Sequence, residues 1–185
     1  MFNLPNILSL LRIALIPVLI ACYFLPYETA SIWATIVFAI ASLTDWLDGY
    51  LARKWNQTSP FGAFLDPVAD KLIVAVALIL VLYQTPEWYV LIPVVIIIGR
   101  EITISALREW MAEIGQRNAV KVSYMGKLKT SFQMLSIGCL IFHNPLFGLP
   151  IFDIGISLLY VASALTISSM WSYLKAAWPI MKSNG

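Results

Sequence analysis

Charged side chains are scarce in this 185-residue chain: Asp, Glu, Lys and Arg make up 12% of it, about half the share found in an average soluble domain. Cysteine and histidine are scarcer. Cys22 and Cys139 each lie inside an apolar run, which argues against a disulfide framework and against a zinc site. We expect the single histidine, His143, to pack rather than to bind a metal. The net charge of +2 is too small to indicate a nucleic-acid partner.

Long hydrophobic runs dominate the chain instead. Apolar residues make up 60% of it, and the mean hydropathy is +0.81. A bilayer core about 30 Å thick needs roughly 20 mostly apolar residues per helix. Six stretches satisfy this, at about 5–25, 30–53, 64–83, 88–112, 125–143 and 150–175. The sequence therefore predicts an all-α fold, a polytopic bundle of six transmembrane helices forming one domain over residues 1–185.

The basic residues predict the orientation of this bundle. On the six-helix layout all twelve Lys and Arg fall on one side, or in the helix halves nearest to it. The opposite turns, near residues 26–30, 84–88 and 143–150, carry none. The positive-inside rule then places the basic side and both termini in the cytoplasm. The first apolar run lacks a cationic leader and a clear cleavage site, so we expect it to remain as a membrane helix.

Two pairs of acidic residues lie inside the apolar runs. Asp45 and Asp48 are three residues apart, and Asp66 and Asp70 are four apart, so each pair shares one face of its helix. The two helices are neighbours joined by a short loop, which would bring the pairs together. An acid at the membrane centre costs roughly 2.5–3.5 kcal/mol, and four carboxylates repel one another. A cation must therefore offset them.

An oxygen-only ligand set suits Mg²⁺ or Mn²⁺, and two such ions could share the four carboxylates. The alternative is that the acids pair with Arg53, Lys54 and Lys71 as a solvated rim. Gly49 and Gly62 lie beside the acids, where a missing side chain permits either close helix packing or the approach of a phosphate.

These residues form a specific motif. The run DWLDGYLAR at 45–53, followed after eight residues by GAFLDPVAD at 62–70, fits the pattern D-x2-D-G-x2-A-R-x8-G-x3-D-x3-D. The chain thereby resembles the CDP-alcohol phosphotransferase family. The stretches 3–12, 99–101, 106–110 and 126–130 resemble those members that make phosphatidylglycerophosphate and CMP from CDP-diacylglycerol and sn-glycerol 3-phosphate.

The resemblance implies a role for each matching residue. The four aspartates would bind the metal, and Asp70 would also be the general base. The CDP-lipid would contact helix 1 and the start of the motif, and basic residues further along would take the acceptor's phosphate. The implied CDP-lipid residues are Asn6, Ser9, Gly49, Arg53, Ser59 and Gly62, and the implied acceptor-phosphate residues are Arg100, Arg108 and Lys127.

The phosphate assignment also has support from the residues themselves. Arg100 and Arg108 are eight residues apart, about two helical turns, and so share a face. An arginine inside a membrane helix is costly and usually functional, and its planar fork suits a phosphate. The alternative is pairing with Glu101, Glu109 or Glu113 on the same helix. We expect Lys129, like Arg117 and Lys121, to be a membrane-surface charge.

Several functional alternatives stay open at this stage. A relative with another acceptor, such as inositol phosphate, serine or phosphatidylglycerol, would carry the same motif. A divalent-cation transporter would use similar acids, but nearer the bilayer centre and often in inverted repeats. The family resemblance further implies a homodimer in the bacterial inner membrane, with the active site on the cytoplasmic side and membrane lipids as neighbours.

Overall fold

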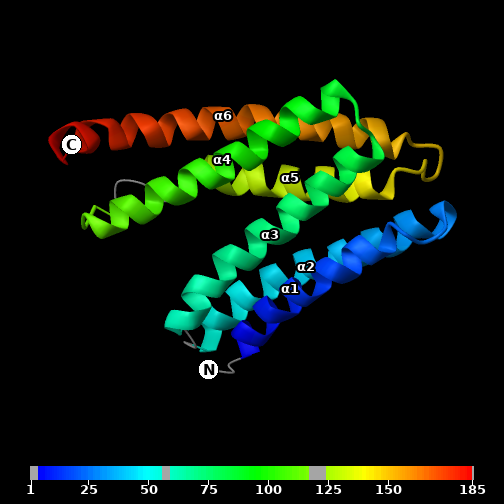
Figure 1. Cartoon of the computed structure of the whole chain (residues 1–185), viewed down its shortest axis with the longest axis horizontal. Coiled ribbons are helices and arrows are strands. Elements are labelled where there is room, and N and C mark those ends of the chain that lie inside the picture. Colours follow the sequence, from blue (N-terminus) through cyan, green and yellow to red (C-terminus); the bar gives the residue numbers. More distant parts are fainter. Residues whose placement is uncertain (1–3, 56–58, 117–123, 185) are drawn as a thin grey trace. The chain divides into compact units, whose positions relative to one another are not determined.

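The computed structural model describes residues 4–55, 59–116 and 124–184, and this part of the chain forms six helices without a named strand (Figure 1). The six predicted helices are thus confirmed, with ends that differ by a few residues except in the last. The helices are α1 (Leu4–Cys22), α2 (Tyr27–Trp55), α3 (Pro60–Gln84), α4 (Trp88–Glu113), α5 (Tyr124–Phe142) and α6 (Ile151–Asn184). The last helix runs about nine residues beyond the predicted 175 because its apolar stretch continues through Trp178 and Ile180.

The helices group into two compact units. Unit 1 comprises residues 1–85 and 137–155, and unit 2 comprises 86–136 and 156–185. In unit 1, α1 packs against both α2 and α3 (Figure 1). Alanines at the centre of this packing, Ala34, Ala41, Ala69 and Ala77, are at most 1% exposed. Their small side chains let the helix backbones approach closely, which is how membrane helices gain packing energy.

Local sequence signals explain two features of unit 1: the start of α3 and the connection from α5 to α6. Ser59 caps α3, its side chain accepting a hydrogen bond from the Gly62 amide, and Pro60 occupies the first turn, where no amide donor is needed. After α5 the chain turns through Gly148, whose φ of 79° favours glycine. His143 packs its ring 4.5 Å from that of Phe152, in line with the expected packing role.

Unit 2 consists of α4 with most of α5 and α6. Ile104, Leu107 and Met111 line one side of α4 and form a buried cluster with Tyr173 and Ala177 of α6. This cluster fixes the two helices against each other at the level of Arg108. The polar groups of this unit lie beside it.

The outer faces of the helices are apolar. Thr29–Leu51, Trp88–Glu113 and Ile151–Lys182 are long and apolar enough to cross a membrane, and shorter apolar helices lie at Asn6–Cys22 and Leu128–Phe142. Large side chains such as Trp33, Phe64 and Ile79 are more than half exposed. Such surfaces are unfavourable in water and suit contact with lipid.

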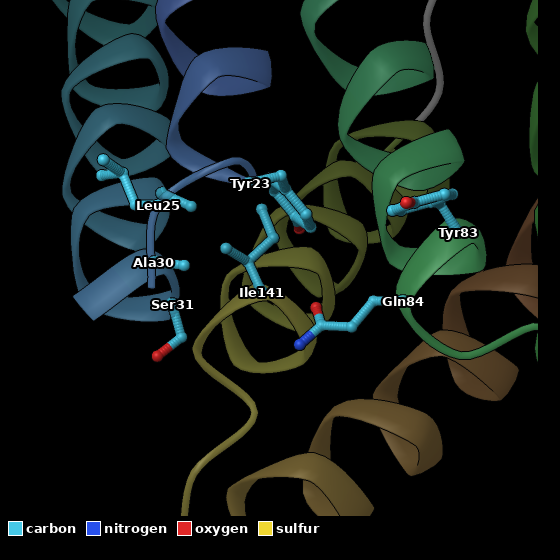
Figure 2. Close-up of a pocket in the computed structure, with 8 residues that line it drawn as sticks. Tyr23, Leu25, Ala30, Ser31, Tyr83, Gln84 and Ile141 are labelled. Atoms are coloured by element: carbon cyan, nitrogen blue, oxygen red, sulfur yellow. The ribbon is translucent and has the colours of Figure 1, made fainter. Parts of the chain in front are cut away.

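A cavity of about 210 Å³ lies in unit 1 where α1 ends and α2 begins (Figure 2). Tyr23, Ser31, Tyr83 and Gln84 supply its polar groups. None of its lining residues is a predicted site residue, and α1, α2 and α3 carry the predicted site at their opposite ends.

Candidate active site

One face of α1 is both polar and buried. Asn6, Ser9 and Arg12 follow one another at spacings of three residues and are 2%, 0% and 0% exposed. Residues three apart lie on one side of a helix, and this side meets α2 and α3. The first turns of α1 therefore present a row of hydrogen-bonding groups to the acidic ends of the two neighbouring helices.

Asn6 joins the beginning of α1 to the beginning of α3. Its Nδ2 donates to Ser59 Oγ at 3.0 Å, and Ser59 Oγ in turn accepts from the Gly62 amide at 2.9 Å. A Cβ at position 62 would collide with Asn6 Oδ1. Three predicted CDP-lipid residues are thus together, and the missing side chain of Gly62 makes room for Asn6.

Ser9 lies between the two pairs of acids. Its Oγ is 2.5 Å from Asp66 Oδ1 and 3.4 Å from Asp48 Oδ2. A hydroxyl has one proton to donate, and the shorter distance gives that proton to Asp66. Ser9 therefore ties the α3 pair to the α2 pair through α1.

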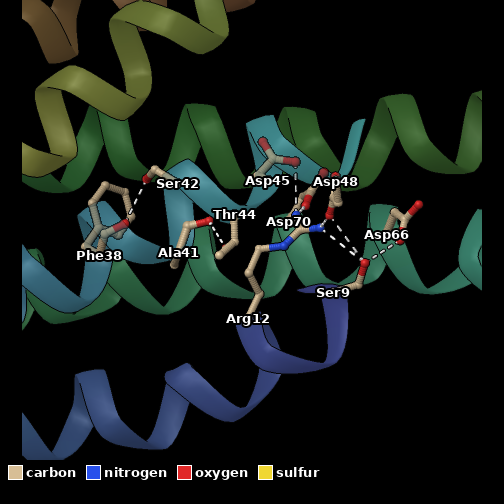
Figure 3. A network of polar contacts seen from close by, with 10 residues as sticks. All are labelled: Ser9, Arg12, Phe38, Ala41, Ser42, Thr44, Asp45, Asp48, Asp66 and Asp70. Carbon is tan, nitrogen blue, oxygen red and sulfur yellow. Dashed lines mark hydrogen bonds and ion pairs between the residues drawn. The ribbon is translucent and has the colours of Figure 1, made fainter. Parts of the chain in front are cut away.

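Arg12 contacts the remaining acids (Figure 3). Its Nη1 is 3.0 Å from Asp45 Oδ1 and also pairs with Asp70 Oδ1, while its Nη2 pairs with Asp48 Oδ2. Asp45 and Asp48 come from α2 and Asp70 from α3, so a single guanidinium joins three helices. The structure thus gathers the four predicted acids at one place. Their ion-pair partner in the described part is Arg12, and not Lys54 or Lys71, which the alternative of a solvated rim would have required.

The acids differ in their access to the surroundings. Asp48 is 5% exposed, whereas the side chains of Asp45 and Asp70 are 35% and 39% exposed. The cluster is therefore closed on the Asp48 side and open on the side of Asp45 and Asp70. One guanidinium offsets only one of four carboxylate charges, so the site retains a strong attraction for a further cation.

The donor set suits a hard divalent ion, since carboxylate oxygens are the ligands that Mg²⁺ and Mn²⁺ prefer. The side chains as placed do not yet form its coordination shell. Across residues 4–55, 59–116 and 124–184, no three acidic, His or Cys side chains converge in a metal-binding arrangement. Nitrogens of Arg12 contact the oxygens that three of the acids would supply.

Unit 2 holds the predicted phosphate-binding arginines. Arg100 of α4 is 7% exposed, and its Nη2 donates to Ser169 Oγ of α6 at 3.3 Å. Its Nη1 donates to Glu101 Oε1 at 3.2 Å, so the alternative pairing with a neighbouring acid also occurs. Glu101 does not neutralise Arg100 alone, because the same oxygen contacts Lys129.

Tyr173 lies between the two arginines. Arg100 Cζ is 5.8 Å and Arg108 Cζ 5.2 Å from the centroid of its ring, and Arg108 Nη2 donates to the Tyr173 hydroxyl at 3.2 Å. Both distances are within the range of cation–π attraction. The ring therefore holds two like charges at a fixed separation. Tyr173 is not among the site residues predicted from the sequence.

The expectation that Lys129 is a surface charge is wrong. It is 2% exposed and pairs with Glu101. A lysine can face inward in a membrane bundle when a carboxylate offsets its charge. A signal was present in the sequence: Lys129, Gln133 and Ser136 are spaced as i, i+4 and i+7, and all three are buried.

Three predicted residues contribute less to this picture. Gly49 follows Asp48 on α2 and is half-buried. The side chains of Arg53 and Lys127 lie outside the described part of the structure, so their assignments to the CDP moiety and to the acceptor phosphate stay predictions.

Comparison with known proteins identifies the family. Residues 2–173 match the family model described as CDP-alcohol phosphatidyltransferase. The chain belongs to this family. It is 49% identical over 176 residues to the CDP-diacylglycerol--glycerol-3-phosphate 3-phosphatidyltransferase of Pectobacterium atrosepticum, and 48% identical to the protein of that name in Salmonella choleraesuis. Each alignment covers 95% of this chain and 95% of the relative.

The family match extends over both units of the chain. The matched residues include the buried polar face of α1, the acids of α2 and α3 and the arginines of α4, and the match ends at Tyr173. A relative from Shigella flexneri serotype 5b, with the same name, is 47% identical over the same share of both chains. The regions matched by the family model and by these relatives thus include all the helices that carry the polar contacts described above.

Proposed function

We propose that this protein is a CDP-diacylglycerol–glycerol-3-phosphate 3-phosphatidyltransferase. It transfers the phosphatidyl group of CDP-diacylglycerol to sn-glycerol 3-phosphate and releases CMP. The observation that carries the proposal is the gathering of Asp45, Asp48, Asp66 and Asp70 around the buried stripe of α1, in a chain whose full-length relatives bear this name.

Unit 1 is the part we assign to the CDP-lipid. Asp45, Asp48, Asp66 and Asp70 would hold one or two Mg²⁺ or Mn²⁺ ions, which when bound would offset the charge of the diphosphate and of the departing CMP. Asn6, Ser59 and Gly62 line the edge of this cluster at the start of α3. Gly49 and Arg53 complete the assignment from the motif.

Unit 2 is the part we assign to the acceptor. Among the side chains that the structure describes here, Arg100, Arg108 and Lys129 carry three positive charges, and Glu101 is the acid that pairs with two of them. A phosphate dianion matches the surplus charge, and guanidinium forks bind phosphate through two parallel hydrogen bonds. Lys127, on the same helix as Lys129, belongs to this assignment by its motif. Acceptors without a phosphate, such as serine, would bring no anion to offset this surplus positive charge.

Asp70 is the proposed general base. Its side chain is 39% exposed, the most open of those in contact with Arg12, and can be reached by a hydroxyl group. It accepts the proton of the acceptor's free primary hydroxyl. The oxygen then attacks the phosphorus that carries diacylglycerol, a new P–O bond forms, and the bond to CMP breaks. Holding the acceptor by its phosphate removes much of the entropic cost of this step.

The proposal includes a location. We propose that all six helices cross the bacterial inner membrane, with both termini and the aspartate cluster on the cytoplasmic side. Three apolar helices of membrane-spanning length and the one-sided distribution of Lys and Arg support this topology. A homodimer is part of the same proposal and rests on the family resemblance.

An acceptor panel tests the function. Purified protein receives CDP-diacylglycerol with sn-glycerol 3-phosphate, inositol phosphate, serine or phosphatidylglycerol, and CMP release is measured with and without a chelator. We expect release with glycerol 3-phosphate alone, abolished by chelation and restored by Mg²⁺ or Mn²⁺. Preferential release with another acceptor would contradict the proposed substrate, and release unaffected by chelation would contradict the metal.

Asp70→Asn tests the base assignment. We expect turnover to fall by at least roughly 100-fold, the scale of general base catalysis, while the variant still inserts into membranes and folds. Asp153→Asn, which removes an exposed carboxylate from the first turn of α6, is the matched control and keeps activity. Near-normal turnover of Asp70→Asn would refute the assignment.

A further inference from the structure

Arg12 is the least expected member of the aspartate cluster. Its side chain is 0% exposed, in the first half of α1, yet it is not a residue that the motif or the family match assigns to the site. It is placed by contacts to Asp45, Asp48 and Asp70, while Asp66 is held by Ser9. Its position is thus defined by three of the four proposed metal ligands.

The contacts of Arg12 overlap with those of a divalent ion. Mg²⁺ binds carboxylate oxygens at about 2.0–2.1 Å and requires near-octahedral geometry. Oxygens turned toward a guanidinium point their lone pairs at its N–H groups rather than at a common centre. Two cations among the same three carboxylates would also repel each other. Arg12 and the ion cannot both use these oxygens as the structure places them.

We propose that Arg12 is a tethered counter-ion of the metal site. In the metal-free protein it holds Asp45, Asp48 and Asp70 together, and it gives up their oxygens when a divalent ion binds. This inference rests on the proposed metal site. It explains why a buried arginine is kept in α1: without it, carboxylates on α2 and α3 would face one another uncompensated whenever the ion is absent.

If Arg12 and the ion exchange in this way, removing the charge of Arg12 should raise the affinity for the ion and lower the stability of the metal-free protein. Any contact that stabilises only the metal-free state must be given up on binding, and so weakens binding. Arg12→Gln keeps an amide donor but removes the charge. We expect it to bind Mn²⁺ roughly 10- to 100-fold more tightly, on the scale of hydrogen bonds to charged groups. Its metal-free form should unfold at a lower temperature than the parent, and saturating Mn²⁺ should restore most of the difference.

The experiment titrates Mn²⁺ into the full chain in lipid nanodiscs without CDP-lipid, with bound and free ion separated by electron paramagnetic resonance. Arg12→Lys keeps the charge but not the fork, and should lie between the parent and Arg12→Gln in affinity. Lys175→Gln, which removes an exposed cation from α6, is the control and should bind as the parent does. No Mn²⁺ binding by the parent would contradict the proposed function itself. Parent binding with equal or weaker binding by Arg12→Gln would overturn only the role of Arg12.

A measurement on the unsubstituted protein covers the case in which Arg12→Gln does not fold. The chain has five arginines, so selective ¹⁵N-arginine labelling gives few guanidinium signals. Arg12→Lys identifies the signal that belongs to position 12. Adding diamagnetic Mg²⁺ should shift that signal as its carboxylate partners are withdrawn. A position-12 signal that stays unchanged at Mg²⁺ saturation would overturn the inference.

Discussion

Two substitutions of Tyr173 can separate the contribution of its hydroxyl group from that of its ring. Tyr173→Phe keeps the ring between Arg100 and Arg108 but removes the hydroxyl that accepts from Arg108. Hydrogen bonds to charged groups contribute about 1.5–3 kcal/mol, and the lower end applies because Arg108 is only half-buried. Since about 1.4 kcal/mol corresponds to a factor of ten, Tyr173→Phe should raise the KM for glycerol 3-phosphate about tenfold. Tyr173→Leu also removes both ring contacts, each about 0.5–1 kcal/mol at a partly exposed site. Together they correspond to about a further factor of ten, so the KM should rise to about 100-fold above the parent.

The assay varies each substrate separately while CMP release is followed. The KM for CDP-diacylglycerol should stay within about twofold of the parent, because the hydroxyl and the ring of Tyr173 contact Arg108 and Arg100, which are assigned to the acceptor. Tyr160→Phe is the matched control: its hydroxyl donates to the Tyr89 carbonyl, away from the arginines, and both KM values should be unchanged. Equal changes in the two KM values, or a Leu variant no weaker than the Phe variant, would refute the idea that the ring spaces the arginines for phosphate.

Three further changes test other parts of the site. Gly62→Ala places a methyl group against Asn6 Oδ1, so it should lower the free energy of unfolding by about 1–3 kcal/mol and weaken CDP-lipid binding. Gly138→Ala is the control, because there is open space around Gly138. Equal shifts in unfolding temperature for the two variants would contradict the close approach of Asn6 to Gly62. Arg100→Ala should raise the KM for glycerol 3-phosphate with little change for CDP-diacylglycerol, and the reverse pattern would place the phosphate elsewhere. Glu101→Gln leaves two buried cations without their shared acid and should lower the unfolding temperature; an unchanged temperature would show that the cations find other partners.

The helices were predictable because each follows a long apolar run. All six runs that were selected with a bilayer about 30 Å thick in mind became helices, and Pro26, Pro86 and Asn144 fall between helices. The predicted end of the last helix, at about residue 175, falls short of the end of α6 and coincides with the charge of Lys175. A basic residue close to a membrane surface does not end a helix, since its long side chain can reach the polar region.

The acidic cluster was predictable from spacing, and its partner was not. Helical periodicity tells which residues share a face, so the pairing of Asp45 with Asp48 and of Asp66 with Asp70 followed directly. The same reasoning does not tell which face of a third helix meets them. Arg12 was therefore given no role in the predicted site, although its spacing from Ser9 placed it on the same face.

The residues that sequence reasoning missed share a feature that a membrane bundle makes informative. In a water-soluble helix the buried stripe is apolar, whereas here the outer face of α1 carries Leu4, Ile7 and Leu11 at 41–44% exposure and its inner face is polar. Buried polar stripes recur in α5 and in α6, where Thr166, Ser169 and Tyr173 are at most 5% exposed. Lipid offers no hydrogen bonds, so a polar side chain in a membrane helix is stabilised only by facing other protein groups or a bound substrate. Stripes of polar residues at helical spacing therefore indicate the inward face of each helix, and in this chain the inward faces are the ones that carry the candidate chemistry.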